Sequence, residues 1–181
     1  MPDEKAVAAR CHEPGPLRLL FLGNVIRRKG LHWALQELSC VPDGIWRLDV
    51  VGSLAVDPAY VADLRRQVKR LGLESNVRFY NALSTADLCE RFLQNHVLVV
   101  PSYEGYGIIY LEAMSFGVVP VASTAGAAGE IITDELDGFL VNTAASGELA
   151  GLVQRLYQDR DMLNRLGLAA RRRFEAQPTW E

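Results

Sequence analysis

The stretch from Val97 to Val121 constrains the fold of this chain more than any other segment. It begins with the apolar run VLVV, which is typical of a strand that is buried on both faces of a sheet. Pro101 and Ser102 interrupt the run, a glycine-spaced turn follows, and an amphipathic segment then extends to Gly117. A second apolar run begins at Val118. Strand, turn, helix and strand in this order predict a crossover unit of a parallel sheet.

The rest of the chain repeats this alternation of strands and helices. Further strands are predicted at residues 17–22, 46–51, 76–80 and 139–141, and helices at 31–38, 58–71, 84–93, 148–157 and 161–174. The pattern predicts an α/β fold with a Rossmann-like, doubly wound parallel sheet and helices on both faces. Residues 1–16 are interpreted as a linker or tail, and 17–181 as one domain.

Composition excludes several classes of protein. With 49% apolar residues, a chain of 181 residues can bury one substantial core. The net charge of −3 argues against a general nucleic-acid binder, so no nucleic-acid partner is expected. Three cysteines, at positions 11, 40 and 89, show no paired spacing, which favours a reducing, cytoplasmic location over a disulfide framework or a zinc site. Neither a signal peptide nor a run of roughly 20 apolar residues is found.

The turn after the VLVV strand carries two glutamates. Glu104 lies in the turn and Glu112 lies eight positions further on, in the predicted helix. A helix that begins near Gly107 directs its free N–H groups and its dipole at an anion in front of it. The carboxylates then stand up to roughly 10 Å apart, which exceeds the separation of about 5 Å in a retaining glycosidase. This spacing suits two ends of an elongated ligand, with a sugar at each end and phosphates between; ordinary solvated positions are the alternative.

A second candidate site follows the first strand. Arg27, Arg28 and Lys29 directly precede Gly30 and the start of a helix, so cations and backbone amides could converge there on a diphosphate. A solvated basic turn is the alternative, because short runs of charge are common on exposed loops.

One family combines these features. The pattern Pro101-Ser102-x-Glu104-x-Tyr106-Gly107-x-x-x-Leu111-Glu112-Ala113-Met114, followed by Gly117-x-x-Pro120-Val121, resembles the signature of the group 1 glycosyl transferases. These are retaining enzymes of the GT-B fold that use nucleotide sugars. The resemblance implies that residues 17–181 form the C-terminal, nucleotide-sugar-binding half of such an enzyme, without the N-terminal acceptor domain. The expected activity is transfer of a hexose from a nucleoside-diphosphate sugar with retention, and the isolated domain is expected to be inactive.

The resemblance also assigns roles to residues. Glu104 and Lys29 are the catalytic candidates, and Lys29 would neutralise charge on the leaving diphosphate. The substrate-binding candidates are Glu112 for the ribose, the amides of Tyr106, Gly107 and Ile108 for the hexose and its phosphate, Asn24 and Arg28 for the diphosphate, and Tyr80 and Leu83 for the base. Asn24 replaces the arginine of the family, so either Arg27 or Arg28 compensates or the phosphate grip is weaker. For Tyr80, ordinary packing at a strand end is the alternative.

Other functions and partners remain open at this stage. No metal or cofactor is expected, because no carboxylate cluster suited to a metal is present and the donor is a substrate. One rival is a non-catalytic Rossmann-like module for a dinucleotide, although residues 23–30 lack its close glycine triplet. Another is a different GT-B enzyme, such as a sugar-nucleotide epimerase or a glycogen-type phosphorylase. The arginines of 160–174 suit a solvated face or a peripheral contact with anionic lipids at the inner face of the membrane.

Residues 177–181 resemble the start of the family's last crossover helix.

Overall fold

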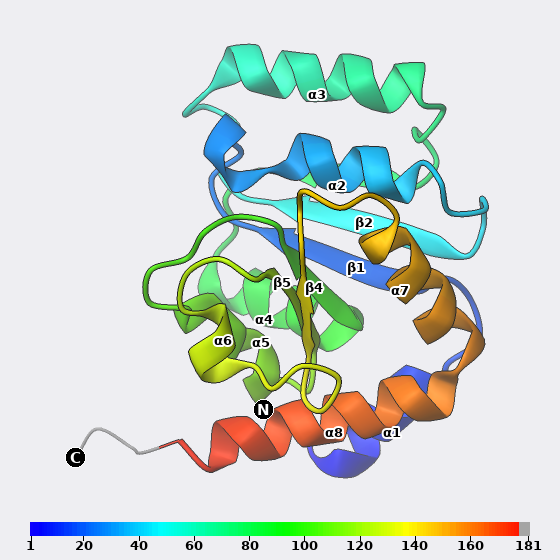
Figure 1. Ribbon diagram of the computed structural model, residues 1–181, viewed down its shortest axis with the longest axis vertical. Helices are drawn as coiled ribbons and strands as arrows, with labels where there is room; N and C mark the ends of the chain where they lie inside the picture. Colours follow the sequence, from blue (N-terminus) through cyan, green and yellow to red (C-terminus); the bar gives the residue numbers. More distant parts are fainter. Residues whose placement is uncertain (178–181) are drawn as a thin grey trace.

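A sheet of six parallel strands forms the centre of the molecule (Figure 1). The structure is a computed structural model that describes residues 1–177. The strands are ordered β3-β2-β1-β4-β5-β6 across the sheet. Their bounds are Leu17–Leu22 for β1, Trp46–Val51 for β2, Val77–Tyr80 for β3, Val97–Val100 for β4, Val119–Ser123 for β5 and Phe139–Val141 for β6. The chain starts at the middle of the sheet and winds outward in both directions, which confirms the predicted doubly wound arrangement.

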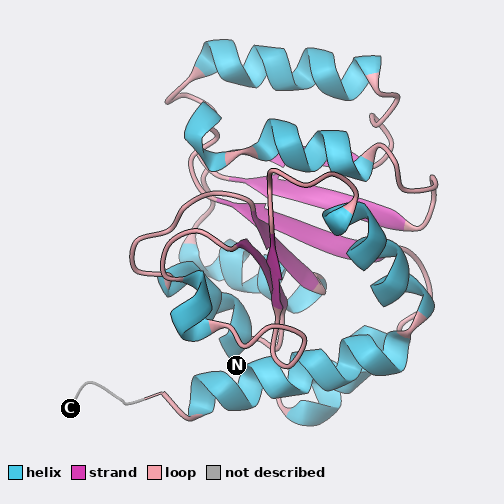
Figure 2. Ribbon diagram, viewed as in Figure 1, coloured by secondary structure: helices cyan, strands magenta, loops and turns pink. Residues whose placement is uncertain are grey.

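Helices cover both faces of the sheet, and Figure 2 shows the strands enclosed between them. One face carries α2, α3 and α7, and the other carries α4, α5 and α6, while α1 and α8 pack together at one end. The bounds are Glu4–His12 for α1, Leu31–Leu38 for α2, Pro58–Arg70 for α3, Thr85–Gln94 for α4, Ile108–Ser115 for α5, Ala128–Ile131 for α6, Glu148–Gln158 for α7 and Arg160–Glu175 for α8, with a short 3-10 helix η1 at Arg27–Lys29.

Side chains of the central strands alternate between two hydrophobic cores, one on each face of the sheet. In β1, Leu19 and Phe21 point into the cluster beneath α2, α3 and α7, whereas Leu20 points into the cluster beneath α4 and α5. All four residues of β4 are buried, because helices cover it from both sides. The apolar run VLVV therefore belongs to a central strand, as its composition predicts.

The first sixteen residues correct the expectation of a linker or tail. Glu4–His12 is helical and packs against α8, with Val7 and Cys11 buried. The helix shows little amphipathic pattern, because a charged residue, Arg10, is buried beside them. The weak pattern is the reason that periodicity alone does not predict it. Residues 178–181, part of the segment that resembles a crossover helix, lie outside the described residues.

The arginines of α8 have partners within the fold. Arg160 donates to the carbonyls of Gly15 and Tyr157, and Arg173 donates to those of Glu130 and Ile131. Ion pairs with Glu4 and Glu175 hold two others, at positions 172 and 171. These contacts serve the domain itself, and the lipid contact stays a prediction. Among residues 1–177, no helix combines the length and apolar character that crossing a membrane would need.

Candidate active site

The predicted site residues gather at the carboxyl edge of the sheet. The loops that follow β1, β4 and β5 all leave the sheet at this edge, seen at the left of Figure 1. Strand β1 lies between β2 and β4, so the direction of winding changes at the β1/β4 boundary. In open α/β sheets, ligands bind at such a topological switch point.

An ion pair joins the two loops at this boundary. Lys29 Nζ lies 2.5 Å from Glu104 Oε1, and Ser102 Oγ donates to the same oxygen at 2.5 Å. The side chains of Lys29 and Glu104 are 15% and 17% exposed, so salt screens the pair less than it screens a surface pair. Ser102 is 4% exposed and was not among the predicted site residues, although it belongs to the motif. Both known partners of this carboxylate use one oxygen, which leaves Oε2 to accept from a ligand.

The loop after β5 fixes the backbone of Glu104. Ala127 N–H donates to the carbonyl oxygen of Glu104 at 2.9 Å, and Gly126 forms an isolated bridge with the same residue. A Cβ on Gly126 would lie 2.5 Å from that oxygen, and its φ of 80° also favours glycine. The small residues Gly126 and Ala127 therefore pack against the backbone of Glu104 and fix its position.

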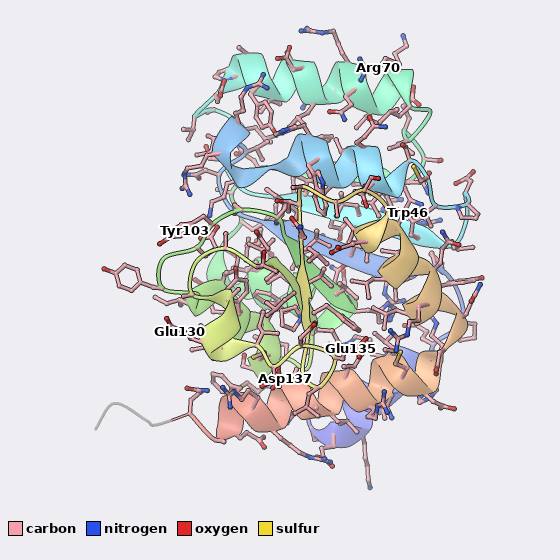
Figure 3. All side chains as sticks on the ribbon, viewed as in Figure 1. Trp46, Arg70, Tyr103, Glu130, Glu135 and Asp137 are labelled. Carbon is pink, nitrogen blue, oxygen red and sulfur yellow. The ribbon has the colours of Figure 1, made fainter. Side chains whose placement is uncertain are left out.

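The N-terminus of α5 opens beside Glu104. Gly107 precedes the helix with φ of 65°, and a Cβ there would lie 2.3 Å from Ile131 Cδ1. The amides of Tyr106, Gly107 and Ile108 take part in none of the backbone hydrogen bonds found among the described residues. Tyr106 is 88% exposed and Ile108 is 64% exposed, and Figure 3 shows Tyr103 on the outside of the same loop. Free N–H groups at the positive end of a helix dipole are chemically suited to an anion, and the role of these residues in substrate binding stays a prediction.

Further along α5, Glu112 is exposed, and its backbone carbonyl rather than its carboxylate accepts from Ser115 Oγ. Tyr110, two residues earlier, is fully buried, and its hydroxyl has no hydrogen-bond partner within residues 1–177. Burial raises the pKa of Tyr110, and the nearby Glu104 carboxylate raises it further. The phenol therefore stays protonated. The burial of Tyr110 beside Glu104 was not predicted, because nothing in the sequence distinguishes this tyrosine from an exposed one.

A small cavity continues the site along the ends of β1 and β2. It encloses about 180 Å³ and is lined by Leu22, Gly23, Asn24, Val51, Gly52, Ser53, Ala82, Leu83 and Leu88. Asn24 and Leu83 thus line the same cavity, and their roles in binding the diphosphate and the base stay predictions. Tyr80 does not line it, because its ring stacks against Arg91, with the guanidinium carbon 4.3 Å from the ring centroid.

The two arginines that could compensate for Asn24 are placed differently. Arg28 Nη1 donates to the carbonyl of Tyr103 at 3.4 Å and so reaches across to the loop before α5. Arg27 turns away towards α3, where it pairs with Asp63 at 3.3 Å and lies over the ring of Tyr60. Of the two, Arg28 is positioned to supply the missing charge.

The predicted absence of a metal stays a prediction. Within the part of the chain that the structure describes, no group of three or more histidine, cysteine, aspartate or glutamate side chains is arranged to hold a metal ion. The positive groups at the site are those of Lys29, Arg28 and the α5 N-terminus.

Comparison with known proteins places this geometry in a family. The model of the family described as "Glycosyl transferases group 1" matches residues 4–173. A D-inositol 3-phosphate glycosyltransferase from Arthrobacter sp. (strain FB24) is 27% identical over 161 residues, which are 86% of this chain and 38% of that protein. The chain therefore spans less than half the length of this relative.

Solved structures agree with the family match. The Anabaena protein HepE in complex with UDP has a TM-score of 0.80 at 26% identity, over 87% of this chain and 43% of that chain. The C-terminal domain of the glycosyl transferase group 1 family protein LpcC from Francisella tularensis has a TM-score of 0.82 at 21% identity, over 98% and 93% of the two chains. The chain belongs to the group 1 glycosyl transferases and has the fold of the C-terminal domain of a GT-B glycosyltransferase.

Proposed function

We propose that this chain is the donor-binding half of a retaining glycosyltransferase, which moves a hexose from a nucleoside-diphosphate sugar to an acceptor held by an N-terminal domain. The observation that carries the proposal is the 2.5 Å contact between Lys29 and Glu104 beside the free amides of α5. A cation, a carboxylate and a helix N-terminus meet there at the switch point of the sheet. These groups can bind the phosphates and the hydroxyls of a sugar diphosphate.

Charge determines how the diphosphate would bind. Its negative oxygens compete with Glu104 for Lys29, and the amides of Gly107 and Ile108 supply further donors without a net charge. During transfer, negative charge grows on the leaving diphosphate, so a fixed cation and a helix dipole stabilise the transition state more than the ground state. Lys29, Arg28 and α5 would perform this task, and no metal is required by the proposal.

The two glutamates would hold the two sugars of the donor. A carboxylate accepts hydrogen bonds from vicinal hydroxyls, and Glu112, which is exposed on α5, would accept them from the ribose. Glu104 Oε2 would accept from the hexose, while Ser102 keeps Oε1 engaged. The cavity beside Asn24 and Leu83 would take the base.

The comparison with HepE supports this reading of the donor, since that protein binds UDP and shares the fold over most of this chain. The relatives are more than twice as long as this chain, which supports a second domain that carries the acceptor. We expect the isolated chain to bind the donor weakly and not to turn it over. A cytoplasmic location, peripheral to the membrane, is part of the same proposal.

The test is calorimetric titration of the 181-residue chain with UDP, GDP, ADP and NAD. The wild type is compared with Glu112→Ala and with Glu90→Ala, in which another exposed helical glutamate is removed. We expect one nucleoside diphosphate to bind, and Glu112→Ala to weaken it by tenfold or more, since a charged hydrogen-bond acceptor contributes about 1.5–3 kcal/mol. Glu90→Ala should bind like the wild type.

Two results would contradict the proposal. Binding of NAD alone would favour the non-catalytic dinucleotide module. Equal binding of a nucleoside diphosphate by wild type and Glu112→Ala would show that the glutamates of the motif do not contact the donor.

A further inference from the structure

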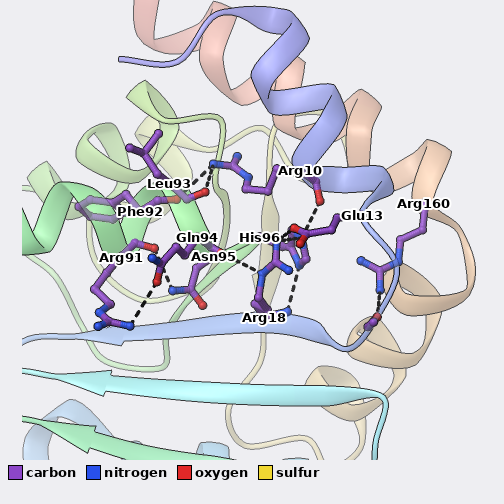
Figure 4. A network of polar contacts seen from close by, with 11 residues as sticks. Arg10, Glu13, Arg18, Arg91, Phe92, Leu93, Gln94, Asn95, His96 and Arg160 are labelled. Carbon is purple, nitrogen blue, oxygen red and sulfur yellow. Dashed lines mark hydrogen bonds and ion pairs between the residues drawn. The ribbon is translucent and has the colours of Figure 1, made fainter.

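A second polar cavity lies under α4, near the amino ends of the first three strands. It encloses about 150 Å³ and is lined by Arg18, Arg47, Asp49, Asn76, Arg78, Tyr80, Arg91, Gln94 and Asn95. Figure 4 shows its wall around Arg18, Arg91, Gln94 and Asn95. Arg18 lies five residues before Gly23, so this cavity is roughly 16 Å along the strand from the carboxyl edge. We refer to it as the arginine pocket.

The arginine pocket interrupts an otherwise apolar sheet face. Towards the carboxyl edge, Leu20 and Val51 on this face are buried in the core beneath α4 and α5. Two residues earlier on the same strands stand Arg18 and Asp49, and such positions share a face of the sheet. Helix α4 has Phe92 as its one fully buried residue. This part of the interface therefore packs through charged side chains where helix and sheet usually exchange apolar ones.

The register of the strands brings like charges together. Arg18 of β1 and Arg47 of β2 are direct neighbours, and like charges on neighbouring strands destabilise a sheet. Arg78 of β3 is the neighbour of Asp49, and Asp49 also receives Arg91. Four arginines thus surround one aspartate, an excess of three positive charges, and Glu13 on Arg18 offsets one of them. The whole chain, in contrast, carries a net charge of −3.

Arg18 forms short bonds, to the Gln94 carbonyl at 2.5 Å and to Glu13 at 2.8 Å, whereas the bonds of Arg91 are long. Arg91 Nη1 lies 3.5, 3.4 and 3.3 Å from oxygens of Asp49, Tyr80 and Gln94, whereas an optimal charged hydrogen bond measures about 2.8 Å. Its Nε is buried and has no partner within residues 1–177. Arg47 and Arg78 are exposed and take part in none of the ion pairs among the described residues.

We infer that the arginine pocket binds a phosphate group, either as the free ion or as a phosphate ester. A dianion balances the excess charge, and the planar forks of several guanidinium groups match the oxygens of a phosphate. It lies between Arg18 and Arg47 and so reduces their repulsion, and it offers a charged acceptor to Arg91, whose present bonds are long. This site is distinct from the donor site, which lies at the other edge of the sheet, and it does not depend on the proposed function.

The test is thermal unfolding and calorimetric titration with sodium phosphate, compared with sodium chloride at equal ionic strength. Because phosphate could also bind at the donor site, every titration is repeated on Lys29→Gln. The pocket variants are Arg47→Gln and Arg78→Gln, which remove exposed side chains, and Arg165→Gln on α8 is the matched control. We expect saturating phosphate to raise the Tm of the wild type and of Lys29→Gln alike, by roughly 5 °C. Each pocket variant should weaken phosphate binding by about tenfold.

Repulsion between Arg18 and Arg47 predicts a second effect, a change in Tm whose direction depends on whether phosphate is present. Without phosphate at low ionic strength, Arg47→Gln should have a higher Tm than the wild type, because it removes a like-charged neighbour. Saturating phosphate should reverse this order. An order that phosphate does not change would overturn the inference.

Other results separate the sites and the sources of the ligand. A phosphate shift that disappears in Lys29→Gln and persists in Arg78→Gln would assign phosphate to the donor site and overturn the inference, as would the absence of any shift or an equal loss in Arg165→Gln. Glycerol 3-phosphate is the second probe. Tighter binding of inorganic phosphate than of this ester identifies the free ion as the ligand, and the reverse identifies an ester such as a lipid headgroup.

Discussion

Polar groups at the two edges of the sheet differ in exposure and in hydrogen bonding. At the carboxyl edge, the α5 amides and Glu104 Oε2 remain available, and Tyr106 is 88% exposed. At the amino edge, Arg10 and His96 are 7% and 1% exposed, and both bind carbonyl or amide groups of the fold. The comparison indicates that the polar groups around Glu104 are available to a ligand, whereas Arg10 and His96 stabilise the fold. The arginine pocket is a separate part of the amino edge, because its Arg47 and Arg78 are exposed and form no ion pair among the described residues. Each prediction below tests one side of this contrast, from the largest expected effect to the smallest.

Arg10 should carry the largest effect. Its guanidinium donates to the carbonyls of Phe92, Leu93, Phe116 and Gly117 at 3.2, 3.5, 2.9 and 2.8 Å. Two of these carbonyls lie in the last turn of α4 and two directly follow α5, so all four are at helix C-termini, where the dipoles favour a cation. We expect Arg10→Ala to lower the free energy of unfolding by about 3–5 kcal/mol, because it leaves buried acceptors without donors. Urea denaturation measures the change.

Arg172→Ala is the matched control for Arg10. It removes an exposed ion pair between α8 and Glu4 of α1, which is expected to cost less than about 1 kcal/mol. Comparable losses in the two variants would mean that the buried arginine is no more important to the fold than a surface pair.

Arg10 also shows where sequence reasoning stops. The strands and the doubly wound sheet followed from apolar runs and turn residues, and the helices predicted at 58–71 and 84–93 are present as α3 and α4. Helix α1 did not follow, since a buried arginine that binds carbonyls far along the chain interrupts its apolar pattern. Local periodicity carries no signal of such a contact.

In the candidate site, too, the sequence predicted which loops meet but not the contacts between side chains. Lys29, Glu104 and Gly107 were all named as site residues from the sequence, and they lie near one another because the loops that follow the neighbouring strands β1 and β4 meet at the carboxyl edge. The contact of Ser102 with Glu104, the burial of Tyr110 and the stacking of Tyr80 on Arg91 depend on side-chain directions. The arginine pocket depends on register, which places Arg18 beside Arg47, and register is fixed only when the sheet forms.

His96 should make stability depend on pH at the amino edge. Its Nδ1 accepts from Arg18 N–H at 3.0 Å and its Nε2 lies 2.9 Å from the carbonyl of Arg10, which fixes a neutral tautomer. Burial, aided by the charge of Arg18, lowers the pKa of His96 from 6.5 to about 3. The unfolded chain therefore takes up this proton first as pH falls. The contribution is fully present above pH 6.5 and is lost towards pH 3, about 3 kcal/mol of it by pH 4.

The measurement is the free energy of unfolding between pH 7 and 4 for wild type and His96→Gln. Carboxylates titrate in both proteins, so the difference between the two pH slopes isolates the histidine. NMR titration of the imidazole in the wild type provides a check that does not depend on the variant. A ring that becomes charged near pH 6 in the folded protein would be inconsistent with a neutral, structural histidine.

Lys29 tests the carboxyl edge. We expect Lys29→Gln to weaken binding of the preferred nucleoside diphosphate by about 10- to 100-fold, since a charged hydrogen bond contributes about 1.5–3 kcal/mol. Binding of the matching nucleoside, which lacks phosphates, should not change. Lys69→Gln on α3 is the control, because it removes an exposed lysine outside the site. Equal weakening of nucleoside and diphosphate would mean that Lys29 supports the loop rather than the phosphates.

Substitution of Ser102 should give the smallest change in affinity, and this change should be confined to ligands that carry the hexose. Its hydroxyl holds Glu104 Oε1 at 2.5 Å, and this bond would remain when a diphosphate draws Lys29 away. We expect Ser102→Ala to free the carboxylate and reduce the extra affinity that the hexose adds, by about fivefold or 1 kcal/mol, while affinity for the nucleoside diphosphate stays unchanged. The ratio of the two Kd values, with and without hexose, measures the effect, and Ser39→Ala removes a serine hydroxyl bonded to a helix carbonyl for comparison. A fall in both affinities by the same factor would instead assign Ser102 to the folding of the loop, because only a residue that orients Glu104 can act on the hexose alone.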